Sequence, residues 1–92
     1  MAIEFDPAKN AANVAKHGLS LARFVGFDGQ PHVAADNRFE YGEPRFRAWG
    51  RIAGVGYCVA YTTSQSGIRL ISFRRAHEKE MRRYENTGPT PT

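Results

Sequence analysis

The sequence is poor in the residues that build cross-links and metal centres. It has one cysteine, Cys58, so no disulfide can form within the chain, and the apolar neighbours of that cysteine indicate burial in a strand. The three histidines are far apart along the chain: His17, His32 and His77. There is no His-x-x-x-His or Cys-x-x-Cys pair, and the acidic residues lack the spacing of a calcium loop. We therefore expect no metal and no other cofactor.

Long apolar runs and phosphate-binding loops are also missing. No apolar stretch approaches the ~18 residues of a membrane helix, and the first five residues lead into a polar segment rather than a signal-peptide core. Strand-like residues separate the glycines at 50, 54, 56 and 67, so they form no phosphate loop before a helix. The serines lack the setting of a nucleophile elbow. We expect a soluble, cytoplasmic protein without membrane contact, and neither a nucleotide-binding fold nor a serine hydrolase.

What the chain does contain is positive charge. Its 92 residues are enough for one domain with one core, and they carry 13 lysines and arginines against 9 acidic residues, a net charge of +4. A basic protein of this size is suited to an acidic partner, either nucleic acid or protein.

The first third of the chain predicts a strand followed by two helices. Residues 2–5 can form a short strand, after which Asp6 and Pro7 begin a helix that Gly18 ends. Small side chains recur on one side of this helix and predict that it packs closely on a sheet through them: Ala8, Ala11, Ala12 and Ala15. Another, polar face carries Lys9, Asn13, Lys16 and His17. Ser20 is expected to cap a second helix over residues 21–27, which the glycines and proline at 26–31 then break.

The rest of the chain predicts strands and one more helix. Short strands are expected at residues 32–35, 45–52 and 56–63, with a tight turn at Ala53-Gly54, and a further strand from Ile68 runs into a C-terminal helix. The fold class is therefore α+β, a small antiparallel sheet with two N-terminal helices and a C-terminal helix. Residues 1–86 form one domain, and residues 87–92 form a disordered tail.

The basic and proton-transferring side chains suit RNA cleavage. The 2′-hydroxyl of RNA is an internal nucleophile, so an enzyme has to remove its proton, stabilise charge on the phosphate and protonate the leaving oxygen. The candidates for catalysis are Lys16, His17, Glu43, Arg69 and Arg74. The candidates for RNA binding are Arg45, Arg47, Arg75, Arg82, Arg83 and Tyr84.

Each candidate also has a purely structural interpretation. Lys16 and His17 can complement a helix dipole, and Glu43 before Pro44 can simply end a loop. Arg82 and Arg83 can pair along the helix with its glutamates. The strand arginines can form salt bridges at the edge of the core, and the tyrosines can serve as packing residues.

Arg69 and Arg74 impose a geometric condition. They are five positions apart, so they project to opposite faces of a regular strand. Both can approach one phosphate only if a twist, a bulge or the end of the strand redirects Arg74.

Several motifs resemble the BrnT toxins in sequence and in order. The matching stretches are Phe5-Asp6-Pro7-Ala8-Lys9-Asn10, Asn13 with Lys16-His17-Gly18, Asp36 with Arg38, Tyr41-Gly42-Glu43, Ile68 to Ala76, and Arg82-Arg83-Tyr84-Glu85. The resemblance implies a RelE-like ribonuclease toxin of a type II toxin-antitoxin system that inhibits translation. It also implies a BrnA-like antitoxin whose ribbon-helix-helix domain would link the complex to operator DNA, with RNA as the substrate.

A second hypothesis comes from another class of function. A basic module that binds nucleic acid or an antitoxin without cleaving RNA has the same composition, and only the reaction products distinguish it from an enzyme.

Overall fold

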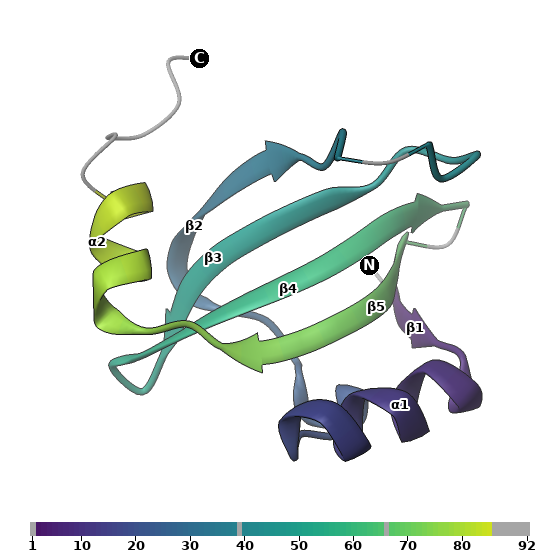
Figure 1. Cartoon of the computed structure of the whole chain (residues 1–92), viewed down its shortest axis with the longest axis horizontal. Coiled ribbons are helices and arrows are strands. Elements are labelled where there is room, and N and C mark those ends of the chain that lie inside the picture. Colours follow the sequence, from purple (N-terminus) through teal and green to yellow (C-terminus); the bar gives the residue numbers. More distant parts are fainter. Residues whose placement is uncertain (1, 39, 66, 86–92) are drawn as a thin grey trace.

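The structure, a computed structural model, describes residues 2–38, 40–65 and 67–85. Its elements are β1 (Ala2–Phe5), α1 (Pro7–His17), the 3-10 turn η1 (Leu21–Arg23), β2 (Asp28–Ala35), β3 (Phe46–Ile52), β4 (Val55–Ser64), β5 (Gly67–Arg75) and α2 (Glu78–Glu85). The strands form one sheet in the order β1-β5-β4-β3-β2 (Figure 1). The tail expected at residues 87–92 lies outside the described residues. None of the described helices has the length and apolar character needed to cross a membrane.

The sheet is mixed rather than antiparallel. The antiparallel pairing of β3 with β4 and of β4 with β5 confirms the expected run of three strands, and Ala53 and Gly54 form the two-residue turn of the first hairpin. However, β1 pairs with β5 in parallel, with Phe5 opposite Leu70. The prediction of an antiparallel sheet is therefore wrong, because the alternation of residues within a strand does not say in which direction a distant strand pairs with it.

The second N-terminal helix was also predicted wrongly. The hydroxyl of Ser20 does cap the segment by accepting a hydrogen bond from the amide of Ala22 at 3.2 Å, but only the single turn η1 forms. Leu21 and Phe24 are both buried against the sheet, and the backbone of Phe24 is already extended. Because burial of these two side chains fixes the chain after one turn, the described residues contain two α-helices instead of three.

Strand β2 begins earlier than the sequence predicts. The stretch expected to be a turn is part of the strand, whose pairing with β3 shifts register between Asp28 and His32. This irregularity accommodates Pro31, which has no amide hydrogen to donate. Since β2 is at the edge of the sheet, the missing donor is tolerated.

Helix α1 presents its polar face to the sheet. Its caps are as expected, with the Asp6 carboxylate accepting from the Ala8 amide at 2.7 Å and Gly18 in the left-handed region. The four alanines of the expected packing stripe are all exposed, so that prediction is wrong. The buried residue is Asn13, which donates to the Phe73 carbonyl at 2.8 Å and accepts from the Phe73 amide at 3.0 Å. The pairing of β1 with β5 ends at Phe5 and Leu70. Beyond this point the side chain of Asn13 supplies hydrogen bonds to the backbone of β5.

Apolar side chains cover both faces of the sheet. One cluster contains Leu21, Phe24, Ala48, Val59, Leu70 and Phe73, and it is closed by η1. The other contains Trp49, Cys58, Ala76 and Met81, and it lies beneath α2. The expected burial of Cys58 is confirmed.

A glycine allows α2 to lie close to the sheet. A Cβ atom at Gly56 would collide with the side chain of Met81, which is fully buried. Helix α2 therefore rests at one end of β3 and β4, while α1 lies along β5 (Figure 1). The face of the sheet between these two helices remains available for a ligand.

Candidate active site

A bulge in β5 determines which side chains reach this face. Arg74 lies opposite Cys58 and Ser72 opposite Ala60, but the next pair is Tyr61 with Leu70, so Ile71 is an extra residue in β5. Paired residues point to the same side of an antiparallel sheet. The bulge therefore puts Arg69 and Arg74 on one face and meets the geometric condition that their spacing imposed.

A hollow of about 360 Å³ lies on this face between α1 and the sheet. We call it the basic pocket, and its charged or titratable lining residues are Lys9, Lys16, His17, Arg38, Arg47 and Arg74. Asn13, Ser72, Cys58 and several apolar side chains complete the lining. No aspartate or glutamate is among its described lining residues. Five cationic side chains around one hollow form a binding site for an anion.

His17 is the histidine of the pocket. Burial lowers its pKa below the ordinary value of 6.5, and the positive charges of Lys16 and Arg74 lower it further. Its position at the end of α1 suits the dipole interpretation, which would favour the charged imidazolium. Burial and the two neighbouring positive charges act in the other direction and favour the neutral imidazole, a form that can accept a proton.

Arg74 is held in the pocket by a glutamate of α2. Its two terminal nitrogens donate to the two carboxylate oxygens of Glu80 at 3.0 and 2.8 Å, and the indole of Trp49 donates to the same carboxylate at 2.9 Å. The hydrogen bonds from Arg74 lower the pKa of Glu80 to about 2. The guanidinium is thus fixed in orientation, and its Nε–H donates no hydrogen bond to another described group.

Arg38 reaches the pocket from the loop after β2. The carboxylate of Asp36, whose side chain is 1% exposed, accepts from Nε of Arg38 at 2.8 Å and from Nη2 at 2.9 Å. These hydrogen bonds hold the pKa of Asp36 well below its usual range. Asp36 therefore positions a loop arginine that would otherwise be free to move.

Arg47 enters the pocket from β3. Its guanidinium lies 4.9 Å from the centre of the Trp49 ring, and its buried Nε has no hydrogen-bond partner in the described part of the chain. A buried donor without a partner is costly unless a ligand supplies an acceptor. This donor is therefore suited to a phosphate oxygen.

Several predicted site residues lie outside the basic pocket. Glu43 and Arg45 line a second hollow in the loop before β3, where their side chains are 3.7 Å apart and Arg45 stacks on Tyr41. Arg69 shares the face of the pocket but does not line it, and it pairs with Glu4 at 4.0 Å.

The predicted RNA-binding residues at the C-terminal end are also separate from the pocket. Arg75, Arg82 and Arg83 are exposed at or near α2. Tyr84 stacks on Trp49 with ring centres 3.6 Å apart.

Sequence reasoning missed four residues of the site and its support. Lys9, Arg38 and Ser72 line the pocket, and Glu80 orients Arg74. The spacing of Lys9, Asn13 and Lys16 on one helical face was a usable signal, although it indicated a solvent-exposed face. Nothing in the sequence indicated that the loop would bring Arg38 to α1.

The described residues contain no group of three His, Cys, Asp or Glu side chains that could hold a metal ion. Positive charge in the pocket comes from arginine and lysine instead. Cys58 lines the pocket, but burial raises the pKa of its thiol to about 11, so it is a poor nucleophile.

The fold and the pocket define a small protein whose site combines anion binding with one proton acceptor. A site of this composition is suited to a phosphate-bearing ligand. The comparison with known families makes this specific, because the family described as "Ribonuclease toxin, BrnT, of type II toxin-antitoxin system" matches residues 5–80. The chain belongs to this family of ribonuclease toxins, whose type II systems pair each toxin with an antitoxin. No curated protein matches the sequence.

Proposed function

We propose that this toxin cleaves RNA without a metal ion, in the basic pocket, and thereby inhibits translation in the cytoplasm. The observation that carries the proposal is the position of His17, a histidine with a lowered pKa, in a pocket lined by five cationic side chains. This combination supplies a proton acceptor and a binding site for the phosphate, which are two of the three requirements of the reaction.

In the proposed reaction, neutral His17 accepts the proton of the ribose 2′-hydroxyl. The 2′-oxygen attacks the adjacent phosphorus, and the bond from phosphorus to the 5′-oxygen breaks. Lys16, also in the pocket, donates a proton to the leaving 5′-oxygen. The products are a 2′,3′-cyclic phosphate and a 5′-hydroxyl.

Arg74 and Arg47 have the charge-stabilising role. Negative charge that builds up on the phosphate oxygens is stabilised by donors that are already in place. Glu80 fixes Arg74 in orientation, and Arg47 has a buried Nε donor with no described partner. These two arginines come from β5 and β3 and line the pocket from different strands.

Arg69 has a different role in the proposal. Arg69 lies opposite Thr62 on β4, whereas Arg74 lies opposite Cys58. Thr62 and Cys58 are four positions apart along β4. Four strand residues span about 13 Å, so Arg69 is suited to a neighbouring phosphate rather than to the one that is cleaved. Arg45, with its partner Glu43, lies further along the loop and would contact the substrate outside the pocket.

The antitoxin is proposed to be a BrnA-like protein with a ribbon-helix-helix domain, which would bring the complex to operator DNA. We propose that an ordered segment of it covers Arg45, Arg47, Arg69 and Arg74 and extends to Arg75 at the end of β5. Acidic side chains at the phosphate positions would complement this surface. Burial of these arginine side chains in a structure of the complex supports occlusion, and side chains left open to solvent contradict it.

The alternative is a basic module that binds RNA or antitoxin without catalysis. One observation favours the binding module. The guanidinium of Arg74 is already paired with the carboxylate of Glu80, as in an arginine whose role is structural.

Product analysis separates the two functions. Purified protein is incubated with RNA, with and without ribosomes and EDTA, and the ends of the fragments are identified. We expect cyclic phosphate ends, no effect of EDTA, and at least a hundredfold loss of cleavage in His17→Gln, on the scale of general acid-base catalysis. Intact RNA under all conditions, together with normal amino-acid incorporation in a translation extract, would leave the binding module as the function.

A further inference from the structure

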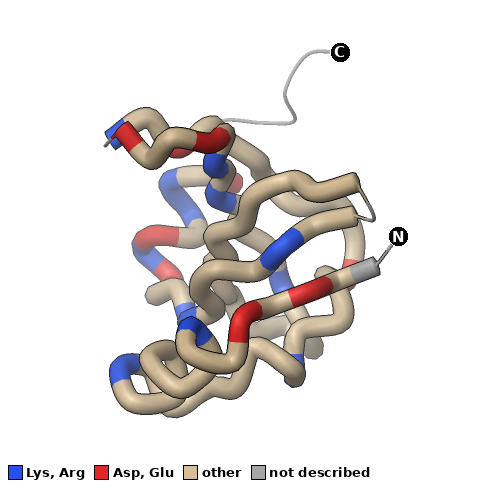
Figure 2. Tube along the Cα trace, turned by 90° about the vertical axis from the view of Figure 1, so that its right-hand side faces the viewer, with Lys and Arg blue, Asp and Glu red and all other residues tan. Residues whose placement is uncertain are grey.

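The carboxylates of α2 all face back toward the sheet. Glu80 pairs with Arg74, as described above, while Glu78 and Glu85 both accept hydrogen bonds from Arg51 of β3. Acidic and basic positions are mixed along the α2 segment of the chain in Figure 2. The ion pairs of these glutamates within the described residues are therefore with arginines of the sheet, although the charges of Arg82 and Arg75 also lower the pKa of Glu78.

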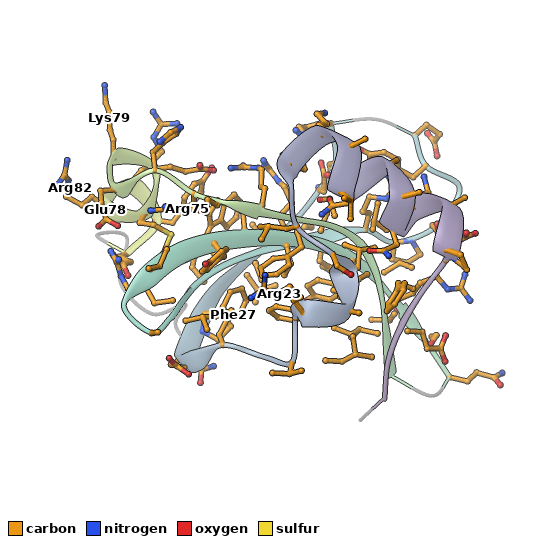
Figure 3. The ribbon with its side chains drawn as sticks, turned by 90° about the horizontal axis from the view of Figure 1, so that it is seen from below. Arg23, Phe27, Arg75, Glu78, Lys79 and Arg82 are labelled. Carbon is orange, nitrogen blue, oxygen red and sulfur yellow. The ribbon has the colours of Figure 1, made fainter. Side chains whose placement is uncertain are left out.

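The basic residues of α2 consequently remain on its outer side. Lys79, Arg82 and Arg83 lie within about 100° of one another around the helix axis, and Arg75 lies just before the helix. All four are exposed, and none forms an ion pair with a carboxylate of the described residues. Figure 3 shows Lys79 and Arg82 projecting from α2 away from the sheet. We call these four residues the α2 basic stripe.

The composition of the stripe indicates its ligand. Protein partners bury an apolar centre within their interface, whereas a nucleic acid needs phosphate contacts. The apolar side chain of Met81 is fully buried, and Tyr84 is half-buried against Trp49. The outward side of α2 therefore presents charge alone, which favours RNA over an acidic protein.

The location of the stripe relates it to the pocket. Arg74 lines the pocket and is ion-paired with Glu80 of α2, the helix that carries three of the four residues of the stripe. From Lys79 to Arg83 the helix rises by about 6 Å, so the stripe can contact more than one phosphate of a strand that leaves the pocket.

We propose that the α2 basic stripe is a second RNA-binding surface, which holds the phosphates of the substrate strand beyond the cleavage site. The proposal rests on the ribonuclease function proposed above, because it takes the ligand to be the same RNA. It implies that the toxin distinguishes long RNA from short oligonucleotides by affinity, without any change in the chemical step.

The test compares the parent with a triple variant, Lys79→Ala, Arg82→Ala and Arg83→Ala. Binding is measured with a fluorescent 20-nucleotide RNA made uncleavable by 2′-O-methylation, over a series of salt concentrations. Cleavage is measured with a tetranucleotide as the short substrate. We expect binding of the long RNA to weaken about tenfold or more at low salt, and the salt slope to fall by about 2, the value for three lost phosphate contacts. Tetranucleotide cleavage and Tm should not change.

A charge-matched control separates a specific surface from general attraction. Arg23 is exposed on η1 and lies on the other side of the sheet from Lys79 (Figure 3). Arg23→Ala removes the same charge as Arg82→Ala, but only the second change should weaken binding of the long RNA. Equal effects of the two changes, or a triple variant with the salt slope of the parent, would overturn the proposal.

Two further outcomes are informative. If the triple variant binds RNA normally but loses antitoxin, the stripe belongs to a protein interface and the proposal is wrong. If the parent cleaves no RNA while the triple variant still loses long-RNA binding, the proposed enzymatic function fails and the second binding surface stands.

Discussion

Replacement of Arg74 tests the site most directly, because this residue links the pocket to α2. Arg74→Ala removes from the pocket the guanidinium that we propose stabilises the substrate phosphate, and it also removes the ion pair with Glu80. Loss of one charge-stabilising donor costs about a hundredfold in cleavage rate, which corresponds to about 2.7 kcal/mol of transition-state stabilisation.

The cost in stability should be much smaller. The side chains of Arg74 and Glu80 are 32% and 23% exposed, so solvent screens the pair, and the indole of Trp49 still donates to Glu80 after the change. We expect a loss of about 1 kcal/mol, since partly exposed pairs contribute little. For a protein of this size, this corresponds to a decrease in Tm of about 4 to 8 °C.

Two further variants show which property of Arg74 matters. Arg74→Lys retains a positive charge near Glu80 but not the planar fork, so stability should recover while cleavage does not. Arg51→Ala is the matched control, because Arg51 pairs with two glutamates of α2 but does not line the pocket. It should lower Tm without affecting cleavage.

RNA cleavage and thermal unfolding are measured on all three variants. Unfolding of Arg74→Ala at ordinary temperature would show that this arginine is structural, and parental cleavage rates in a folded variant would show that it is incidental. A loss of cleavage in Arg51→Ala as large as that in Arg74→Ala would mean that α2 as a whole, rather than Arg74, supports the activity.

Three other predictions follow from the pKa directions and the positioning contacts. The pKa of Glu80 in the folded protein is about 2, below its ordinary value of 4.5, so the contribution of this carboxylate to stability is present above pH 4.5 and is lost as the pH falls toward 2. Glu80→Gln should therefore flatten the dependence of Tm on pH over this range. An unchanged profile would contradict the pairing of Glu80 with Arg74. Because the pKa of His17 is lowered from 6.5, the parental kcat/KM should fall in acidic solution with an apparent pKa below 6.5, whereas an apparent pKa above 7 would exclude His17 as the base. Asp36→Asn and Arg38→Ala should each raise KM severalfold. Because Asp36 acts through Arg38, the KM of the double variant should be no higher than that of Arg38→Ala. Additive effects on KM in this cycle would show that the two residues act independently.

The sequence by itself determined the local elements whose physical causes are local. Asp6, Pro7 and Gly18 set the limits of α1 because capping and a left-handed backbone depend on nearby residues. Alternation of side chains predicted the hairpins, and Ala53-Gly54 identified their first turn. The positive charge and the motifs along the chain indicated an RNA-directed toxin, which agrees with the family match over residues 5–80.

Other features of the fold depended on contacts between distant residues. The polar face of α1 looks solvent-exposed in the sequence, yet Asn13 is buried because β5 has an open edge beyond β1 that needs a hydrogen-bonding partner. The second helix stopped after one turn because Leu21 and Phe24 were more stable buried against the sheet. Neither effect can be read from residues that are neighbours in the chain.

The composition of the site was likewise decided by tertiary structure. Only the extra residue Ile71 in β5 puts Arg69 and Arg74 on one face, and a bulge of this kind appears in the pairing of two strands rather than in the pattern of one. Arg38 joined the pocket through a loop held by Asp36, while Glu43 from the same loop went to a different hollow. The sequence supplied the residue types that RNA cleavage needs, and the folded chain selected which of them share a pocket, because that selection depends on side-chain directions that only the assembled sheet and helices fix.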